Sequence, residues 1–297
     1  MQMINIMHLH KIHTDSFMEC HKGQFYNGEY GIFPIGIINT DTDAYIICEN
    51  EKPRLLFKYR KNIIPKNITD CLFENMKDAT HKTNGRSIAG GIPKNGLYST
   101  YISKNNKIIR KMNSTANSGI VGFYDNVSYF GHMHKTETDI NCRQTAFNKH
   151  NLSKYNECLH GFQYIDKLYK QLLPEFYEYQ KTVIDKIEQK YVIEDTVFTT
   201  VTVNKNFQTA LHKDKGDLKN GFGNLMVVSN GDYNGGYTLF PQYGIGVDCR
   251  NGDFLLMDVH EWHCNSPIEL IDSNTKRLSF VFYLREKMVS KCQRALY

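Results

Sequence analysis

A histidine and an aspartate two residues apart, followed later by a second histidine, have the types and spacing of a metal-binding set. The pair is His212 and Asp214, and the distal residue is His263. Residues two apart in a β-strand point to one face, so His212 and Asp214 can reach one ion while Lys213 points away. Two imidazoles and one carboxylate are the protein ligands of non-haem Fe(II) oxygenases, and they leave positions open for O₂ and a co-substrate. The spacing therefore predicts an Fe(II) site; the alternative is a chance His-x-Asp beside a turn.

Two histidines could supply the distal ligand. His260 and His263 are three residues apart, so on one continuous strand they would face opposite ways and only one could point inward. The spacing from His263 to Pro267, and then to Arg277, favours His263. His260 is then expected to be a hydrogen-bonded residue of the core or of the surroundings of the metal.

Arg277 opens a segment, residues 277–283, in which the side chains alternate in character. Leu278, Phe280 and Phe282 share one face, and Arg277 lies on the other. An arginine on the inner face of a barrel strand is costly unless an anion pairs with it. A dicarboxylate co-substrate would supply that anion through two parallel hydrogen bonds. The alternative is an arginine at the edge of the sheet, in solvent.

Length and composition are those of an ordinary globular protein. The 297 residues fit one large domain or one and a half ordinary ones, with 41% hydrophobic and 23% charged residues. The formal net charge of +5 permits a polyanionic partner without requiring one.

The cysteines and the N-terminus indicate the compartment. Eight cysteines are scattered along the chain, and none forms a Cys-x-x-Cys pair, which excludes zinc-ribbon and dithiol redox motifs. Scattered unpaired cysteines in a chain of this length suit a reducing compartment. The first residues lack the apolar stretch of a signal peptide, and no apolar run is long enough to span a bilayer. We therefore expect an intracellular protein, in the nucleus or cytoplasm, that is not secreted and has no membrane partner.

Helical periodicity is clear in one region, residues 154–191, where Pro174 is expected to start a second helix. Residues 1–70 show short strands and turns, and the Gly-, Asn- and Ser-rich residues 80–130 are expected to form long loops. From Thr196 the composition is that of β-strands to the end of the chain. The strands expected between the two metal-binding motifs are Leu225–Ser229, Tyr237–Pro241, Gly244–Cys249 and Phe254–Val259.

Helices followed by short strands that carry metal ligands fit an α+β protein with a double-stranded β-helix core. This core is the jelly roll of cupin-like proteins, here with flanking helices. We expect an N-terminal elaboration of strands and long loops at residues 1–130. It would pack on a catalytic core of helices and β-helix at residues 131–297, in one continuous domain.

A cluster of basic residues lies in the expected N-terminal elaboration. It forms either a solvated surface or a face that contacts phosphates. The cluster consists of Lys52, Arg54, Lys58, Arg60, Lys61 and Lys66.

Five motifs of the C-terminal part carry a family resemblance. They are His212-Lys-Asp214, the hairpin Gly235–Gly244, Asn251-Gly-Asp253, His263-x-x-x-Pro267 and the segment Arg277–Tyr283. Together they resemble the TET/JBP family of Fe(II)/2-oxoglutarate-dependent nucleic-acid base oxygenases, over roughly residues 196–288. The resemblance implies that His212, Asp214 and His263 bind Fe(II) and that Arg277 binds the distal carboxylate of 2-oxoglutarate.

The same resemblance gives a base-reading role to two polar positions. Asp217, three residues beyond Asp214, matches an aspartate of protist TET proteins. Asp125-Asn126 matches an Asp-Asn pair at the end of a Gly-rich loop. Asp217 and Asn126 are therefore expected to contact a flipped pyrimidine. TET members have a histidine where this chain has Arg285, and this difference leaves thymine, as in the JBP branch, as open as 5-methylcytosine.

The resemblance implies a dioxygenase that uses Fe(II), 2-oxoglutarate and O₂ to hydroxylate the 5-methyl group of 5-methylcytosine or thymine in DNA. One branch of the family uses ascorbate instead of 2-oxoglutarate. The same chemistry on the same fold could act on a protein side chain or a small metabolite, because a fold does not determine the substrate. A third alternative is a cupin-like binding module without metal, which the complete ligand set and Arg277 disfavour.

Overall fold

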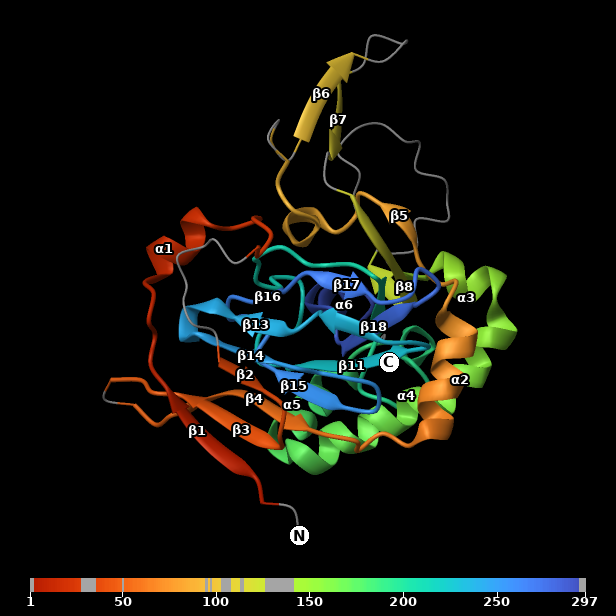
Figure 1. Ribbon diagram of the computed structural model, residues 1–297. Coiled ribbons are helices and arrows are strands. Elements are labelled where there is room, and N and C mark those ends of the chain that lie inside the picture. The colour runs from red at the N-terminus through yellow and green to blue at the C-terminus, as the bar shows by residue number, and fades with distance from the viewer. Residues whose placement is uncertain are drawn as a thin grey trace.

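The computed structural model describes residues 3–27, 36–49, 51–93, 96, 98–102, 108–112, 115–125 and 142–293. Two β-sheets packed face to face form its centre, and helices cover the outer face of the larger sheet (Figure 1). The predicted α+β class with a jelly-roll core is confirmed.

The larger sheet runs through the whole molecule. Four antiparallel strands from the C-terminal half form its middle, and strands from the first 125 residues extend it at both edges. Its pairings are antiparallel except for the one between its first two members. Its order is β1 (Asn5–Leu9), β3 (Thr42–Ile46), β4 (Arg54–Arg60), β15 (Phe254–Met257), β11 (Gly223–Ser229), β18 (Arg277–Tyr283), β10 (Thr200–Lys205), β8 (Ala116–Asp125) and β5 (His81–Thr83), with β9 (Cys142–Gln144) paired to β8.

The smaller sheet faces β15 and β11 across an apolar layer. Phe57 of β4 stacks on Phe240 of the smaller sheet, with ring centroids 5.4 Å apart. Burial of one such ring stabilises the fold by about 1.5–3 kcal/mol. The order of the smaller sheet is β16 (Cys264–Asn265), β13 (Thr238–Phe240), β14 (Ile245–Val247) and β2 (Gly36–Ile38); β12 (Tyr233–Gly235) pairs separately with β17 (Ile268–Leu270).

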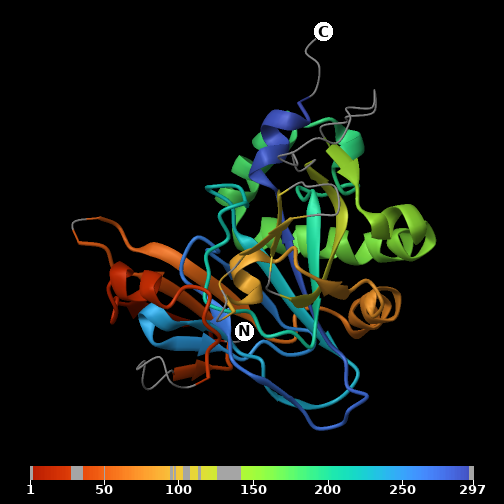
Figure 2. The same ribbon diagram turned by 90° about the horizontal axis from the view of Figure 1, so that it is seen from above.

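The helices lie mainly on the outer face of the larger sheet. Phe162 and Phe282 meet edge to face there, with centroids 5.4 Å apart. In Figure 2 the green helices and the red helix α1 lie on opposite sides of the sheets. The helices are α1 (Asp15–Cys20), α2 (Lys66–Met76), α3 (Ala146–His150), α4 (Leu152–Leu172), α5 (Pro174–Ile184), α6 (Glu286–Lys291) and the 3-10 turns η1 (Ser87–Gly90), η2 (Gln189–Tyr191) and η3 (Pro241–Tyr243).

Two predictions about element type were wrong. Residues 1–70 contain the helix α1 and the start of α2 as well as strands. In α2 the side chains of Ile68, Leu72 and Met76, spaced four apart, are buried. This is helical periodicity that the charged residues around it obscure. The last helix or strand that the structure describes is the short helix α6, against the expectation of strands. An antiparallel bridge between Ile187 and Gln293 fixes the end of this helix against the helical layer.

The expectation of loops throughout residues 80–130 was also wrong, because β8 is a strand of ten residues. Its glycines are needed for close packing and for a backbone conformation with positive φ, although they give the segment the composition of a loop. A Cβ on Gly119 would lie 2.0 Å from the carbonyl oxygen of Ala79, and Gly122 has a φ of +92°. The hairpin of β6 (Tyr98–Ile102) and β7 (Ile108–Met112) projects from the body of the molecule (Figure 1).

Two of the eight cysteines form a disulfide, between Cys142 and Cys292, against the expectation that all are unpaired. The other six are free. The boundary expected near residue 130 falls outside the described residues. In the described part of the chain, the helices are all too short or too polar to cross a bilayer.

Candidate metal centre

The structure brings His212, Asp214 and His263 together. The Nε2 atom of His212 lies 3.5 Å from Oδ1 of Asp214, and Nε2 of His263 lies 3.6 Å from Oδ2 of the same carboxylate. The ligand atoms are all within 4.8 Å of one another. One ion can therefore reach all three groups at once, as the spacing predicts.

The backbone fixes which nitrogen of each imidazole faces the ion. Nδ1 of His212 lies 2.7 Å from the carbonyl oxygen of Ala210, and Nδ1 of His263 lies 2.9 Å from that of Glu261. A carbonyl oxygen can only accept, so each Nδ1 carries the proton and each Nε2 keeps its lone pair for a metal. The donor set fits Fe(II).

The ligands are not on a regular strand, contrary to the premise of the sequence argument. His212 and His263 form an isolated antiparallel bridge with N–H to O distances of 3.0 Å in both directions. The amide of Asp214 donates to the carbonyl of Val259 at 2.9 Å. These bonds give the segment a strand-like course, so the same-face relation of His212 and Asp214 holds.

The site favours the metal-binding protonation states. Burial, and then the neighbouring His263, lower the pKa of His212 to about 4, so its imidazole is neutral at neutral pH. Burial alone would raise the pKa of Asp214, but His212, His263 and the guanidinium of Arg86 outweigh it and keep this pKa below its ordinary value. The Asp214 side chain is 30% exposed, so the ligand set is open on one side.

A cavity of about 540 Å³ lies on that open side. Its lining includes His212, Asp214 and the predicted base-reading residue Asp217. Burial and the charge of Asp214 raise the pKa of Asp217 well above its ordinary value, while Arg285 and Arg86 oppose this shift. At pH values above the ordinary pKa of aspartate, the Asp217 carboxyl can therefore still carry a proton. In that state it can both donate and accept hydrogen bonds.

Arg285 lines the same cavity and forms an ion pair with Asp125 of β8. Its Nε donates to Asp125 at 2.7 Å, and its Nη2 lies 2.5 Å from the same oxygen. Asp125 is buried and also lies 3.7 Å from Lys291. Of the predicted Asp125-Asn126 pair, Asn126 lies outside the described residues.

Arg86 is a cavity residue that the sequence argument missed. Its Nη1 donates to Thr202 at 3.2 Å, and its Nε is buried without a hydrogen-bond partner. In the part of the chain that the structure describes, no carboxylate pairs with it. A single arginine in the Gly-rich segment 85–91 is the signal that could have marked it, but only the fold brings that segment over β10.

Arg277 points inward from β18, as the alternation predicts. It is 2% exposed, its Nη2 donates to the carbonyl of Gly236 at 3.1 Å, and its Nε is buried without a partner. A Cβ on Gly236 would lie 3.1 Å from that Nε, so glycine leaves room for the guanidinium. Arg277 is not itself on the lining of the cavity. Val281, which lines the cavity, lies on the same face of β18, about 13 Å along the strand from Arg277.

A family profile for the oxygenase domain of the 2OGFeDO superfamily, Tet_JBP, matches residues 126–286. The chain belongs to the TET/JBP family. It is 32% identical over 210 residues to the bifunctional helicase and thymine dioxygenase JBP2 of Leishmania braziliensis, covering 68% of this chain and 18% of that protein. With JBP2 of Trypanosoma brucei brucei it is 36% identical over 174 residues, or 58% of this chain and 15% of that protein. The chain thus spans about a fifth of the length of these relatives or less.

A solved structure of NgTET1 in complex with 5mC DNA has the same fold. It aligns with a TM-score of 0.54 at 16% identity and covers 93% of this chain and 89% of that one.

His260 lies outside the ligand set of this TET/JBP chain. Its backbone amide and its Nδ1 lie 3.0 and 3.2 Å from Oδ1 of Asp258, and this hydrogen bond raises the pKa of His260. The expected role of a hydrogen-bonded neighbour of the metal site therefore agrees with its position.

Arg54 of β4 forms salt bridges with the segment that carries His263. Its guanidinium contacts the carboxylates of Asp258 and Glu261, the latter at 2.5 Å. The hydroxyl of Tyr243 donates to Glu261 at 2.7 Å, and the backbone carbonyl of Glu261 orients His263. Three members of the basic cluster at residues 52–66 thus pair with carboxylates of the same chain: Arg54 with Asp258 and Glu261, and Lys58 and Arg60 with Asp43.

Arg54→Met is expected to weaken Fe(II) binding about tenfold or more, because partners that orient a metal ligand are typically worth 10- to 100-fold in affinity. The measurement is a calorimetric titration with Fe(II) under anaerobic conditions. Lys58→Met, on the same strand but paired with Asp43, is the matched control. Affinity within twofold of the parent, with only the melting temperature lowered, would show that Arg54 supports the fold and not the metal ligand.

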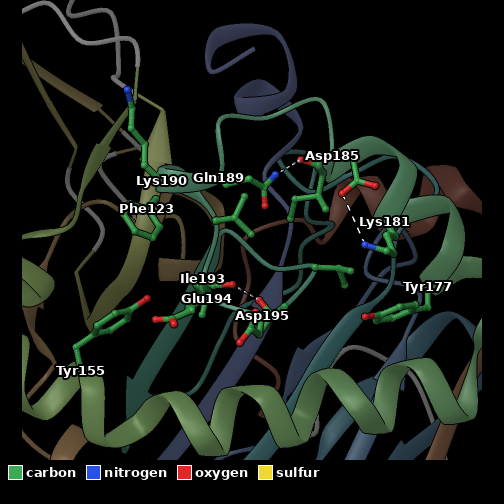
Figure 3. A pocket seen from close by; sticks show the side chains of 14 residues that line it. Phe123, Tyr155, Tyr177, Lys181, Asp185, Gln189, Lys190, Ile193, Glu194 and Asp195 are labelled. Carbon is green, nitrogen blue, oxygen red and sulfur yellow. Dashed lines mark hydrogen bonds and ion pairs between the residues drawn. The ribbon is translucent and has the colours of Figure 1, made fainter. Parts of the chain in front are cut away.

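A second cavity, of about 620 Å³, is separate from this centre. Figure 3 shows its lining, which comes from β8, α4, α5, η2 and the segment that follows η2. This second cavity shares no residue with the first one. Lys181 and Asp185 on its wall pair with each other. Among the described residues, the cluster that could hold a metal ion is His212, Asp214 and His263, of which His212 and Asp214 line the first cavity.

Proposed function

We propose that this chain is an Fe(II)- and 2-oxoglutarate-dependent dioxygenase that hydroxylates the 5-methyl group of a DNA pyrimidine, with thymine as the first candidate. The observation that carries the proposal is the convergence of His212, Asp214 and His263, of which His212 and Asp214 line one cavity. Membership of the TET/JBP family supports it. The thymine dioxygenase names of the JBP relatives favour thymine. NgTET1 in complex with 5mC DNA keeps 5-methylcytosine as the second candidate.

Each part of the site has a role in this reaction. His212, Asp214 and His263 would hold Fe(II), which would activate O₂ with 2-oxoglutarate as the co-substrate. Arg277 would bind the distal carboxylate of 2-oxoglutarate, because its buried guanidinium has no carboxylate partner among the described residues and its Nε is unsatisfied. Burial of such a charge is costly unless an anion joins it.

The cavity would receive the target base after it leaves the duplex, a step that costs a few kcal/mol of unstacking. Thymine presents two carbonyl oxygens and one N–H. Donors from Arg285 and Arg86 suit the oxygens, and a carboxyl on Asp217 suits the N–H. Asn126, next to Asp125 in the sequence, is proposed as a further base contact. A DNA substrate would place the protein in the nucleus of a nucleated cell.

Product analysis tests the proposal. Duplex oligonucleotides with the four standard bases, and others that contain 5-methylcytosine, would be incubated with Fe(II), 2-oxoglutarate and O₂. Mass spectrometry is expected to detect hydroxymethyluracil in both. Hydroxymethylcytosine alone would assign the second candidate. If neither product forms while a peptide or a free metabolite is hydroxylated, the nucleic-acid substrate is wrong.

Asp217→Ala is expected to reduce DNA oxidation about fivefold or more, because a buried hydrogen-bonding group of the base that loses its partner costs about 1–3 kcal/mol. Fe(II) binding and uncoupled turnover of 2-oxoglutarate should persist. Asp217→Asn keeps a donor and an acceptor and should retain more activity than the alanine variant. Asn126→Ala is expected to behave like Asp217→Ala. Loss of Fe(II) binding in Asp217→Ala would move this residue from the substrate to the metal.

A further inference from the structure

Several lysines lie on the lining of the metal cavity. Lys213, Lys215 and Lys287 line the cavity, and none forms an ion pair with a carboxylate that the structure describes. Lys215 and Lys287 are exposed. Lys22, a fourth lysine on the lining, differs because it pairs with Glu19.

These lysines come from two segments that the backbone ties together. Lys213 and Lys215 flank Asp214, and Lys287 lies in α6. The amide of Glu286 donates to the carbonyl of Gly216 at 3.0 Å, and the amide of Leu218 donates to that of Leu284 at 2.9 Å. The two segments therefore lie side by side, and three like charges share one rim.

Nearby acidic groups do not balance this charge. The pKa of Asp15 is lowered chiefly by its hydrogen bonds with Gln242 and Lys11, and that of Glu19 by its hydrogen bond with Lys22. Lys213, and for Glu19 also Lys215, contribute less, because these two carboxylates already pair with Lys11 and Lys22. Lys213 also lies 5.1 Å from the ring of Trp262, which holds the ammonium group near the cavity by a cation–π contact. Uncompensated like charges at one rim are costly without a polyanion that meets them.

We propose that Lys213, Lys215 and Lys287 bind the phosphates on either side of the extruded nucleotide. This inference rests on the proposed function. A base in the cavity stays linked to its own backbone, so its flanking phosphates must lie at the cavity mouth. These lysines line that mouth, and ammonium groups bind phosphates in any sequence context. They fix the position of the target nucleotide, while the polar groups deeper in the cavity contact the base.

The salt dependence of DNA binding tests this assignment. Each lost phosphate contact makes the slope of log K against log salt concentration less negative by about 0.9. The triple variant Lys213→Gln, Lys215→Gln and Lys287→Gln is therefore expected to change this slope by about 2–3 units. Fluorescence anisotropy with a labelled duplex, from 50 to 200 mM salt, would measure it in the intact protein.

The matched control removes the same charge from the helical side, with Lys154→Gln, Lys167→Gln and Lys186→Gln; these side chains form no ion pair in the described part of the chain. The control should keep the parent slope. Lys287→Gln alone should change the slope by about 0.9, and it provides the test if the triple variant does not fold.

Two results would overturn the assignment: a triple variant with the parent slope, or a control that changes the slope as much as the triple variant. The parent protein reports separately on the proposed function. If the parent oxidises DNA and the slope is unchanged, the rim assignment fails alone. If it binds DNA through these lysines but oxidises no DNA base, the proposed function fails alone.

Discussion

His212→Ala, Asp214→Ala and His263→Ala are each expected to abolish Fe(II) binding and turnover. Each variant removes one of three protein ligands whose donor atoms lie within 4.8 Å of one another. Loss of either histidine leaves one imidazole and one carboxylate, and loss of Asp214 also removes the negative charge that offsets the cation. Anaerobic titration with Fe(II) and succinate release with methylated and unmethylated duplex DNA would measure the two effects.

His260→Ala is the control for this experiment. His260 bonds to Asp258 and stands outside the ligand cluster, so this variant should keep measurable activity. Full activity in His263→Ala together with an inactive His260→Ala would show that the distal ligand is His260. The comparison also separates loss of the metal from general destabilisation, because both histidines belong to one segment.

The parts of the site that the sequence predicts depend on local periodicity. His212 and Asp214 share a face because they are two residues apart, and Arg277 faces inward because its neighbours alternate. The helices α4 and α5 were predictable from apolar residues spaced three and four apart. Each of these inferences uses only residues that are close together in the sequence.

The parts that the sequence does not predict depend on distant pairings. Arg54 supports the His263 segment because β4 pairs with β15, and Arg86 reaches the cavity because its segment lies over Thr202 of β10. No local pattern encodes these neighbours. The glycines of β8 predict a loop for a related reason. They are required because the carbonyl oxygens of Ala79 and Thr199, from other parts of the chain, leave no room for a Cβ.

Arg277→Ala is expected to raise the Michaelis constant for 2-oxoglutarate at least tenfold. The guanidinium is buried and has no carboxylate partner among the described residues, and truncation of one member of a buried charged pair costs about 2–5 kcal/mol. Steady-state kinetics with DNA held in excess would measure the change. Arg277→Lys keeps the charge without the planar fork and should show an intermediate defect.

A co-substrate analogue separates a direct contact from a structural effect of Arg277. The analogue 2-oxopentanoate keeps the oxo-acid end of 2-oxoglutarate but lacks the distal carboxylate. In the parent protein it should be a much poorer co-substrate, and in Arg277→Ala the difference between the two acids should nearly disappear, because the two deletions remove one interaction. If Arg277→Ala instead discriminates between the acids as strongly as the parent, the distal carboxylate binds elsewhere. If Arg277→Ala keeps the parent Michaelis constant for 2-oxoglutarate, Arg277 has no role in co-substrate binding, and ascorbate becomes the co-substrate to test.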